Sequence, residues 1–459
     1  MLRERSFAHR YGIACRMGDQ SLGWEELHRR AAALAGLLAA GHGPVLLYGK
    51  KSPEYVIAIA GCLWAGRPYI PAGPHIPAAR VAAMARLAGA VTAVFLTPPP
   101  DELRDMACVP LPRQGEGVYA LPAVEPKDIA YILFTSGSTG TPKGVMVSYA
   151  NLENFIKWFS GRPAIAGIYC RAVLNQAQFS FDLSVADLYY TLYTGCTLEL
   201  PPDGSPLSSC GSRAELAVMT PSCADQCLMD EGFAAKQLPC LQTIFFCGET
   251  LRGSTVRRLW RRFLGLRVIN AYGPTEATCA VTSAEITPEL AEAENLPIGL
   301  QSQEAVAVYL DRNDCICLQG PSVAAGYLGG ERFDGKFMTG DLGEFRAGYL
   351  WYRGRCDEQI KYKGYRIEPG EIEAVLVSQK GIRQAVVLPR RDHLGRVISL
   401  QALVTAAGPL QEGALREQLR FILPDYMVPR RIVQCEKLPL TANGKIDRRK
   451  AGELLQCKW

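Results

Sequence analysis

The sequence lacks the features that would place it in several common protein classes. None of its apolar runs is long enough to cross a bilayer, the longest lying near residues 55–66. The charged residues 1–16 contain no apolar core of a secretory signal. A net charge of +5 over 459 residues is too small to indicate nucleic-acid binding. These absences predict a cytoplasmic protein that neither inserts into a membrane nor binds nucleic acid.

The cysteine and histidine patterns exclude two kinds of site. The 16 cysteines form no C-x-x-C pair, and Cys223 with Cys227 and Cys315 with Cys317 have no His or Cys partner at zinc spacing. We therefore expect reduced thiols rather than a disulfide framework or a zinc site. The 5 histidines fall in none of the glycine-rich motifs, so histidine-based nucleophilic catalysis is a poor fit.

The order of predicted elements indicates an α/β fold with two domains. Strands predicted at 45–48, 69–71, 93–96, 172–175, 197–200, 243–247 and 267–271 alternate with helices, which is the pattern of doubly wound sheets. The predicted helices include one that opens at Ser21 and runs to about Ala40 and one over residues 53–65. From about Val306 shorter strands broken by Gly and Asp predict a small β subdomain. A compact α+β unit follows. We expect an N-terminal domain over residues 1–356 and a C-terminal domain over residues 357–459.

A glycine-rich loop follows the buried strand predicted at 129–134. Small residues let backbone N–H groups approach an anion, hydroxyls add donors, and Lys143 supplies charge. The loop is not a Walker A loop, because Pro142 precedes the lysine and Gly144 follows it. A flexible Gly/Ser linker is the alternative, but the loop leaves a strongly apolar strand and enters a helical pattern at 152–159. The candidate phosphate-binding residues are Thr135, Ser136, Gly137, Ser138, Thr139, Gly140 and Lys143.

A second candidate segment follows the strand predicted at 267–271, where ligands collect at the carboxyl ends of parallel strands. Tyr272 can stack on a base and Thr275 can donate to a phosphate. Glu276 is a hard oxygen ligand suited to magnesium. For the segment alone, a Gly-Pro turn that exposes a glutamate is an equally reasonable interpretation. The candidates are Asn270, Ala271, Tyr272, Gly273, Pro274, Thr275 and Glu276.

Two further motifs, at Asp341 and at Lys445, indicate a function only in combination with the other motifs. Asp341 follows a Thr-Gly turn and is suited to accept hydrogen bonds from two ribose hydroxyls. Lys445 follows an Asn-Gly turn signal, where a lysine is usually a solvated charge. The residues that could contact the same nucleotide as Asp341 are Tyr352, Arg353, Gly354 and Arg355.

Together these motifs resemble the adenylate-forming superfamily, specifically its amino-acid-activating adenylation domains. The resemblance covers nearly the whole chain. It rests on seven motifs in the family's order, at residues 135–144, 181–184, 270–276, 339–341, 354–361, 364–368 and 443–445. It implies a large N-terminal domain, a hinge at Asp357 and a mobile C-terminal lid that carries Lys445.

Within the superfamily the chain is most similar to the D-alanine–carrier-protein ligases, on residues 66–71, 175–185, 245–249 and 272–281. Cys247 matches the cysteine that in those enzymes lines the substrate pocket and bears on stereochemical preference. Ala186 and Cys279 stand where those ligases tend to carry methionine and valine. Either change could reshape the pocket toward another small or medium amino acid. The implied substrate-binding residues are Asp182, Leu183, Ala186, Phe245, Cys247, Ala271, Cys279 and Lys445.

The resemblance implies a two-step reaction with ATP and Mg²⁺. An amino-acid carboxylate attacks the α-phosphorus of ATP, and catalysis comes from positioning and charge neutralisation. Glu276 would hold Mg²⁺, and Lys445 would bridge the substrate carboxylate and the α-phosphate. Asp182 would meet the α-ammonium, because a carboxylate in an apolar pocket is costly without a cation. The aminoacyl group would then pass to the phosphopantetheine thiol of a carrier protein, expected to be a separate chain because no carrier domain precedes Trp459.

Three hypotheses stay open at this point. The first is a stand-alone D-alanine–carrier ligase. The second is a stand-alone adenylation enzyme for another small or medium amino acid in a natural-product pathway. The third is an inactive nucleotide-binding relative, which the joint presence of Glu276 and Lys445 disfavours.

Overall fold

The computed structural model describes residues 10–114, 122–137, 141–168, 170–210, 212–300, 306–392, 395–441 and 445–457. It divides into two compact units. The first unit consists of Met1–Gly73, Ala85–Leu133 and Gly144–Cys356, and the second of Pro74–Met84, Phe134–Lys143 and Asp357–Trp459. None of the helices in these described ranges is both long enough and apolar enough to span a bilayer.

The larger sheet of the first unit has 8 strands, in the order β14-β13-β12-β11-β9-β10-β1-β2. The strands from β13 to β1 pair in parallel, while β14 and β2 pair antiparallel at the two edges. The carboxyl ends of six parallel strands therefore meet along one edge of this sheet. The strands are β1 (Ile13–Met17), β2 (Gln20–Gly23), β9 (Ala172–Asn175), β10 (Thr197–Glu199), β11 (Leu216–Met219), β12 (Thr243–Phe246), β13 (Arg267–Tyr272) and β14 (Thr282–Glu285).

A second sheet of 7 strands has the order β18-β8-β7-β4-β3-β5-β6. Strands β7, β4, β3, β5 and β6 pair in parallel, whereas β18 pairs antiparallel with β8. The strands are β3 (Val45–Tyr48), β4 (Tyr69–Ala72), β5 (Thr92–Phe95), β6 (Ala107–Cys108), β7 (Ile129–Thr135), β8 (Lys143–Ser148) and β18 (Gly326–Tyr327).

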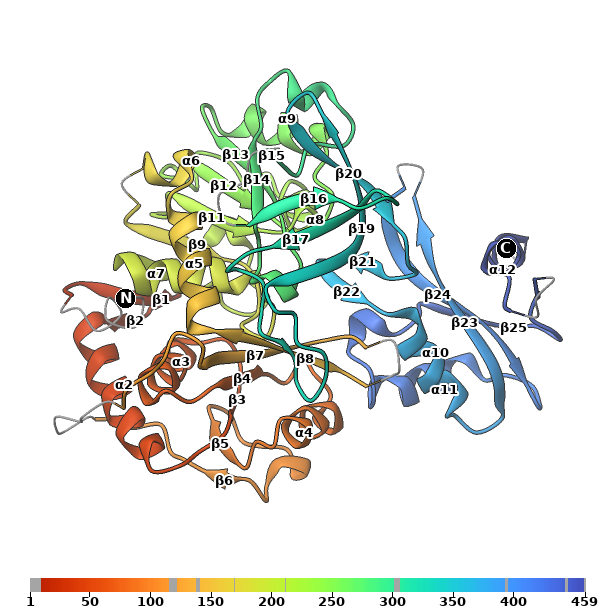
Figure 1. Ribbon diagram of the computed structural model, residues 1–459, viewed down its shortest axis with the longest axis horizontal. Helices are drawn as coiled ribbons and strands as arrows, with labels where there is room; N and C mark the ends of the chain where they lie inside the picture. The colour runs from red at the N-terminus through yellow and green to blue at the C-terminus, as the bar shows by residue number, and fades with distance from the viewer. Residues whose placement is uncertain are drawn as a thin grey trace. The chain divides into compact units, whose positions relative to one another are not determined.

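Helices join the strands of both sheets. Helix α7 packs against β9 and β10, the strands that it connects, and against α5, which lies near it in Figure 1. Helix α3 begins at a Ser52 side chain that accepts from the Tyr55 N–H, and it ends at Gly66 with φ of 68°. Trp24, Ile57, Phe155 and other side chains of both sheets and their helices share one large core. The helices are α2 (Trp24–Ala39), α3 (Pro53–Ala65), α4 (Ala78–Leu87), α5 (Tyr149–Ser160), α6 (Pro163–Ala166), α7 (Ser184–Thr194), α8 (Pro221–Cys227) and α9 (Gly253–Arg262).

The predicted β subdomain is an antiparallel sheet of 5 strands in the first unit, with the order β15-β20-β19-β17-β16. Its central strand β19 places Asp341 directly opposite Arg355 of β20. The strands are β15 (Gly299–Leu300), β16 (Ala307–Leu310), β17 (Cys315–Gln319), β19 (Lys336–Arg346) and β20 (Tyr349–Arg355).

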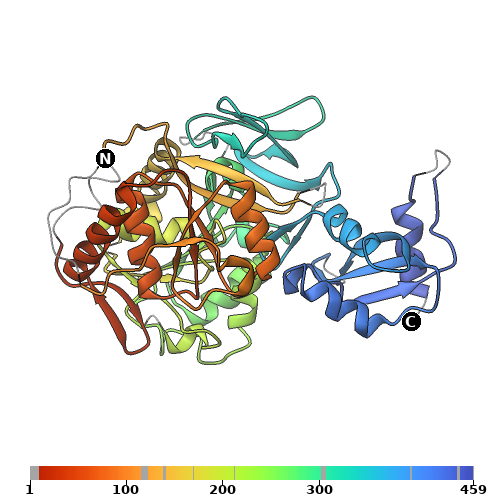
Figure 2. The ribbon, with the colours of Figure 1, turned by 90° about the horizontal axis from the view of Figure 1, so that it is seen from below.

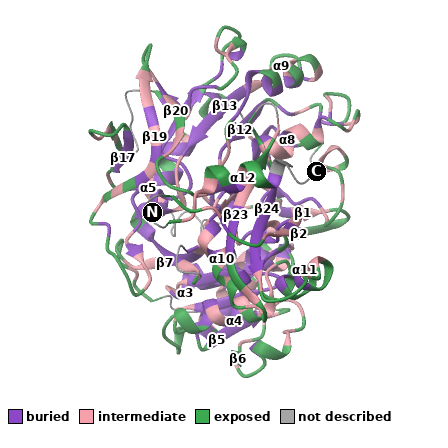
Figure 3. Cartoon of the chain, turned by 90° about the vertical axis from the view of Figure 1, so that its right-hand side faces the viewer, coloured by how far each residue is buried: buried purple, intermediate pink, exposed green. Residues whose placement is uncertain are grey.

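The second unit has its own sheets and cores. A sheet of 3 strands, β23-β24-β25, accompanies the short pair β21-β22. Figure 2 shows helices against this sheet in the blue part of the chain, and Figure 3 shows β24 buried while much of α11 and α12 is exposed. The elements are β21 (Ile360–Tyr362), β22 (Tyr365–Ile367), α10 (Pro369–Val377), β23 (Ile382–Arg391), β24 (Val397–Ala406), α11 (Glu412–Arg420), β25 (Arg431–Gln434) and α12 (Arg448–Cys457).

Most predicted elements agree with the structure to within a few residues, but two local predictions are wrong. The first helix was expected to open at Ser21, whereas Gln20–Gly23 is a strand that pairs with β1 and the helix begins at Trp24. The glycine-rich loop was expected to run directly toward a helix. Instead Lys143 is the first residue of β8, because the apolar run after it is buried as a strand.

Candidate functional site

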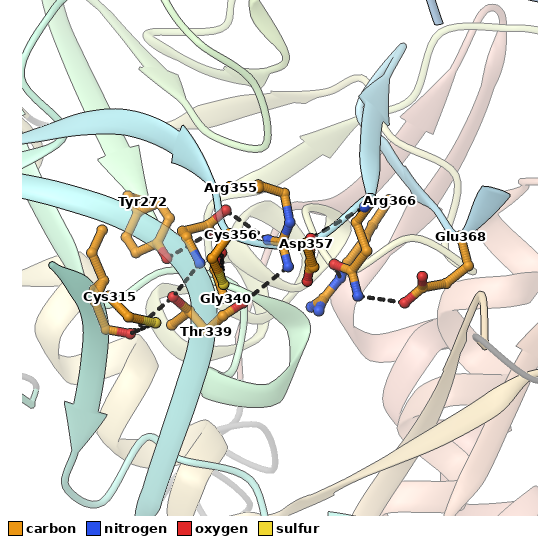
Figure 4. A network of polar contacts seen from close by, with 12 residues as sticks. Tyr272, Cys315, Thr339, Gly340, Arg355, Cys356, Asp357, Arg366 and Glu368 are labelled. Carbon is orange, nitrogen blue, oxygen red and sulfur yellow. Dashed lines mark hydrogen bonds and ion pairs between the residues drawn. The ribbon is translucent and has the colours of Figure 1, made fainter. Parts of the chain in front are cut away.

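A buried ion pair lies at the centre of the candidate nucleotide site. Arg355 Nη1 lies 2.6 Å from Asp341 Oδ1, and their side chains are only 6% and 2% exposed. The Tyr272 hydroxyl donates to Asp341 Oδ2 at 2.7 Å, and the Asp341 N–H donates to Thr339 Oγ1 at 3.0 Å. Figure 4 shows Tyr272, Thr339 and Arg355 converging from different strands. Arginine and phenol donors thus fix the orientation of the carboxylate predicted to bind ribose.

Burial also sets the protonation of Tyr272. Removal from water raises the pKa of its hydroxyl well above the usual value, and the charge of Asp341 raises it further. Tyr272 therefore stays protonated and remains a hydrogen-bond donor to Asp341. Its hydroxyl is committed to this bond, while its ring is the part predicted to stack on a base.

The loop after β13 has a tightly constrained backbone. A Cβ added to Gly273 would lie 2.6 Å from the Ala280 Cα, so only glycine fits this approach. Thr278 and Cys279 both have positive φ, 58° and 72°, which is unusual for residues with a side chain. The fully buried Thr278 hydroxyl donates to the Ser322 carbonyl at 2.7 Å, which helps to hold this conformation. Such strain persists only where surrounding contacts impose it, and it is concentrated at functional sites.

Glu276 lies in this loop with a single turn of 3₁₀ helix around it, Thr275–Ala277. Its side chain is only 1% exposed, and its Oε1 accepts from the Tyr327 hydroxyl at 2.6 Å. Tyr327 belongs to β18, which pairs with β8 directly after Lys143. Tyr327 was not predicted as a site residue, because nothing in the segment Ala325 to Leu328 indicates a ligand.

The structure brings Asp182 and Thr275 together although they are 93 residues apart in the sequence. The Thr275 hydroxyl donates to Asp182 Oδ2 at 2.6 Å, and Asp182 is half-buried. Thr275 was predicted to donate to a phosphate, so its hydroxyl has a different acceptor in the structure. This bond joins the segment predicted to bind ATP to the carboxylate predicted to bind the amino acid.

The other predicted substrate-binding side chains of the first unit are buried in its large core. Their exposed fractions do not exceed 3%. The Cys247 thiol donates to the Cys279 carbonyl at 3.6 Å. Burial raises the pKa of Cys279 well above its usual value, and the charges of Cys247, Asp182 and Asp187 raise it further. The buried set is Leu183, Ala186, Phe245, Cys247, Ala271 and Cys279.

Several predicted nucleotide-binding residues have other partners in the first unit. The Asn270 amide donates to the Pro297 carbonyl at 2.8 Å. Arg353 forms an exposed ion pair with Glu344 and does not join the Asp341 network. Gly354, just before Arg355, has a φ of 131°, which favours glycine. Tyr352 packs against the large core.

The described part of the glycine-rich loop belongs to the second unit, and Ser138, Thr139 and Gly140 lie outside the described residues. The Ser136 hydroxyl donates to the Arg366 carbonyl at 2.7 Å and accepts from the Glu368 N–H at 3.1 Å. The Gly137 N–H donates to Glu371 Oε2 at 3.2 Å. A carboxylate thus contacts one of the backbone groups predicted to bind phosphate. Thr135 ends β7 just before these residues.

The charge of Lys143 acts on Glu368 in the second unit. Burial raises the pKa of Glu368, and the Lys143 ammonium is among the charges that oppose this rise. Glu371 also forms an ion pair with Arg80, so this carboxylate contacts a cation as well as the loop. The sequence did not single out Arg80 or Glu371, since each was one charge among many on a predicted helix.

The predicted hinge and lid residues both lie in the second unit and are exposed. Asp357 is the first residue of that unit after Cys356, and its Oδ1 accepts from the Gln359 N–H at 3.1 Å. Lys445 lies in a turn closed by a bridge between Leu440 and Ile446. Asn443 and Gly444 lie outside the described residues.

The donor set for a metal consists of little more than Glu276. Over the described ranges, no group of three or more His, Cys, Asp or Glu side chains is placed to hold an ion. Mg²⁺ commonly binds through one or two carboxylates while substrate phosphates and waters complete its shell. A single buried glutamate fits an ion that arrives with a nucleotide, and it does not fit a resident metal centre.

Two family models match the chain. The model described as AMP-binding enzyme matches residues 4–328, and the model described as AMP-binding enzyme C-terminal domain matches residues 371–445. A D-alanine–D-alanyl carrier protein ligase of Bacillus velezensis is 35% identical over 477 residues, which cover 94% of this chain and 93% of the relative. A ligase of the same name from Bacillus cereus is 34% identical, with 94% of each chain covered.

Solved structures of similar fold agree with these matches. A holo NRPS protein containing adenylation and PCP domains has a TM-score of 0.83 and 25% identity, covering 99% of this chain and 83% of that one. An adenylation domain of Vibrio cholerae in complex with glycyl-adenosine-5'-phosphate has a TM-score of 0.84 and covers 100% of this chain and 97% of that one. At 22% identity the second likeness concerns the fold alone.

Proposed function

The chain belongs to the AMP-binding enzyme family, and from this premise we propose that it activates D-alanine with ATP and transfers it to a separate carrier protein. The observation that carries the amino-acid assignment is the half-buried Asp182 carboxylate, which accepts from Thr275 and is followed in sequence by the buried Leu183. The relatives that are about 35% identical over nearly their full length are D-alanine–D-alanyl carrier protein ligases, which favours D-alanine among amino acids.

In the first step the substrate carboxylate attacks the α-phosphorus of ATP, forming aminoacyl-adenylate and releasing pyrophosphate. The two reacting groups, the carboxylate and the α-phosphate, are both anionic. The protein must therefore position them and neutralise their charge. Asp182 receives the α-ammonium, and Asp341 receives the ribose hydroxyls in the orientation that Tyr272 and Arg355 impose. Lys445 bridges the carboxylate and the α-phosphate.

ATP enters as its Mg²⁺ complex in this proposal. When bound, the ion would neutralise charge on the phosphates. Glu276, whose Oε1 accepts from Tyr327, would hold the ion. The phosphate groups would take the N–H and hydroxyl groups of Ser136 and Gly137, which in the structure contact Arg366, Glu368 and Glu371.

In the second step the thiol of the carrier's phosphopantetheine arm attacks the acyl carbon and releases AMP. The C-terminal lid turns about Asp357 between the steps, so that Lys445 leaves the site. We place both steps in the cytoplasm, which supplies ATP. Fractionation that finds the protein with another compartment would contradict this placement.

Amino-acid-dependent pyrophosphate exchange across a panel of D- and L-amino acids tests the proposal. D-Alanine is expected to give the highest kcat/KM. Preference for a bulkier side chain would favour an enzyme for another small or medium amino acid, to which Ala186 and Cys279 could adapt the pocket. Absence of exchange with every amino acid would favour an inactive nucleotide-binding relative.

A second experiment tests the role of Lys445. Lys445→Ala should abolish adenylate formation and leave transfer from preformed D-alanyl-adenylate largely intact, because the lysine acts only in the first step. Lys437→Ala, which removes another lysine of the same unit, is the matched control and should retain both reactions. Loss of both reactions in Lys445→Ala would contradict the assignment.

A further inference from the structure

Three polar side chains outside the predicted site form a buried chain in the first unit. Lys51 follows β3, Asn175 ends β9 and Asp187 lies in α7, with exposed fractions of 8%, 0% and 0%. Lys51 Nζ donates to Asn175 Oδ1 at 2.9 Å and to the Gln176 carbonyl at 3.3 Å. Asn175 Nδ2 lies 2.9 Å from each Asp187 carboxylate oxygen. The chain links the 7-stranded sheet to the 8-stranded sheet and to α7.

Burying three linked polar side chains in a core is energetically unfavourable compared with burying apolar ones. Burying an ammonium and a carboxylate costs free energy of solvation, and well-packed apolar side chains in their place are often as stable or more so. A purely structural role therefore explains the three residues poorly. The polar chain does give a defined orientation, because the Asn175 amide cannot turn over without placing its N–H groups against Lys51 and its oxygen against Asp187.

The three side chains lie near residues that are predicted to bind the amino acid. Gln176 follows Asn175 and begins the segment 176–183, which contains Asp182, and Lys51 holds the first carbonyl of that segment. Asp187 follows Ala186 in sequence, and its charge is among those that raise the pKa of the Cys279 thiol. The segment 176–183 thus begins at a carbonyl that Lys51 holds and ends at α7, the helix whose Asp187 is bonded to Asn175.

We propose that Lys51, Asn175 and Asp187 are positioning residues for amino-acid binding, which hold the segment 176–183 and through it the Asp182 carboxylate. The inference rests on the proposed function. None of the three touches the substrate in this scheme. Fixing Asp182 before the amino acid arrives lowers the cost of orienting it during binding.

The charges around the chain give it a pH dependence. Burial raises the pKa of Asp187 to about 8 and lowers the pKa of Lys51. A protonated Asp187 has one good acceptor oxygen, so one of its two contacts with Asn175 weakens below about pH 8. Amino-acid binding should therefore tighten as the pH rises through this value. The titratable groups that face Asp187 and Lys51 from neighbouring elements are Cys15, Cys196, Asp203, Cys223 and Cys279.

The test measures KM for D-alanine and KM for ATP by pyrophosphate exchange between pH 6.5 and 9, on the full chain. The variants are Lys51→Met and Asp187→Asn. Thr191→Val is the matched control, because it also removes a buried polar group of α7, one that contacts Cys196 rather than the chain. Lys51→Met and Asp187→Asn should each raise KM for D-alanine about tenfold, as expected for loss of a hydrogen bond to a charged group. KM for ATP should change less than about twofold.

The pH profile separates positioning from general damage. Wild-type KM for D-alanine should fall as the pH rises through about 8, and this step should be absent in Asp187→Asn. The amine of D-alanine titrates in the same way in both assays, so it cannot cause a difference between the two profiles. Equal rises in both KM values, the same effect in Thr191→Val, or a step that persists in Asp187→Asn would overturn the inference. If the variants fail to fold, a flat wild-type profile overturns it and a step at about 8 supports it. Absence of exchange by the wild-type protein would instead refute the proposed function.

Discussion

Replacing Thr275 with valine tests whether this residue serves the amino acid or the phosphates. Valine keeps the shape of threonine and removes only the hydroxyl that donates to Asp182 Oδ2 at 2.6 Å. By the geometry of the structure, the loss should be felt at the amino-acid site. By the sequence motif alone, it should be felt at the phosphates of ATP.

The size of the effect follows from the kind of bond. A hydrogen bond to a charged group contributes about 1.5–3 kcal/mol, and the half-buried position of Asp182 favours the lower value. About 1.4 kcal/mol corresponds to a tenfold change in affinity. The full loss appears in KM only if the freed carboxylate leaves its binding rotamer before the amino acid arrives. We therefore expect KM for D-alanine to rise between about threefold and tenfold.

The assay is pyrophosphate exchange with each substrate varied at saturating levels of the other. Thr275→Val should leave KM for ATP within about twofold of the wild-type value. Thr275→Ser, which keeps a hydroxyl, is the control and should recover most of the affinity for D-alanine. A rise in KM for ATP with no change in KM for D-alanine would refute the reasoning.

Three other predictions concern single contacts. Tyr327→Phe removes the 2.6 Å hydrogen bond to Glu276 and should raise the Mg²⁺ concentration for half-maximal exchange about fivefold, with an unchanged KM for D-alanine. A magnesium titration checks this, and a change in the D-alanine KM alone would contradict it. Arg355→Met leaves Asp341 buried without its cation and should destabilise the first unit by about 3–5 kcal/mol, measured by urea unfolding against Arg355→Lys. A loss below about 1 kcal/mol would be evidence against a buried pair. Ala186→Met adds volume at a fully buried position and should cost about 1–3 kcal/mol, while excluding side chains larger than methyl. Exchange across the amino-acid panel checks this, and undiminished use of larger amino acids would contradict it.

The sequence was sufficient for those parts of the fold that local chemistry determines. Strand 45–48 and helix 53–65 coincide with β3 and α3, because a buried apolar run, a Ser-Pro start and a left-handed glycine end each signal their structure. Strand β8 was missed because its short apolar run lies between a glycine-rich loop and a stronger helical pattern. The β1-β2 hairpin was missed because its second strand leads directly into a helix.

The candidate site could be predicted as a set of motifs but not as a set of contacts. Glu276 and Asp341 were identified from the turns in which they lie. Their hydrogen bonds to Tyr327, Tyr272 and Arg355 were not predicted. Tyr327 lies 51 residues from Glu276, and Thr275 lies 93 residues from Asp182. Which side chains meet over such separations depends on how the sheets assemble, and a single sequence without related sequences carries no local signal of it. The hydrogen bonds that link Lys51, Asn175 and Asp187 could not be predicted for the same reason.

The left-handed backbone at Cys279 has a consequence for attempts to change the amino acid that the protein accepts. Residue 279 combines a pocket side chain with a φ of 72°, so a substitution there alters pocket volume and backbone energy together. Branched side chains are disfavoured in this conformation, while glycine and asparagine tolerate it. A mutant library that varies Cys279 alone would thus favour small or amide side chains whatever substrate is selected. Varying Ala186, which lies in a regular helix, would sample pocket size without this bias.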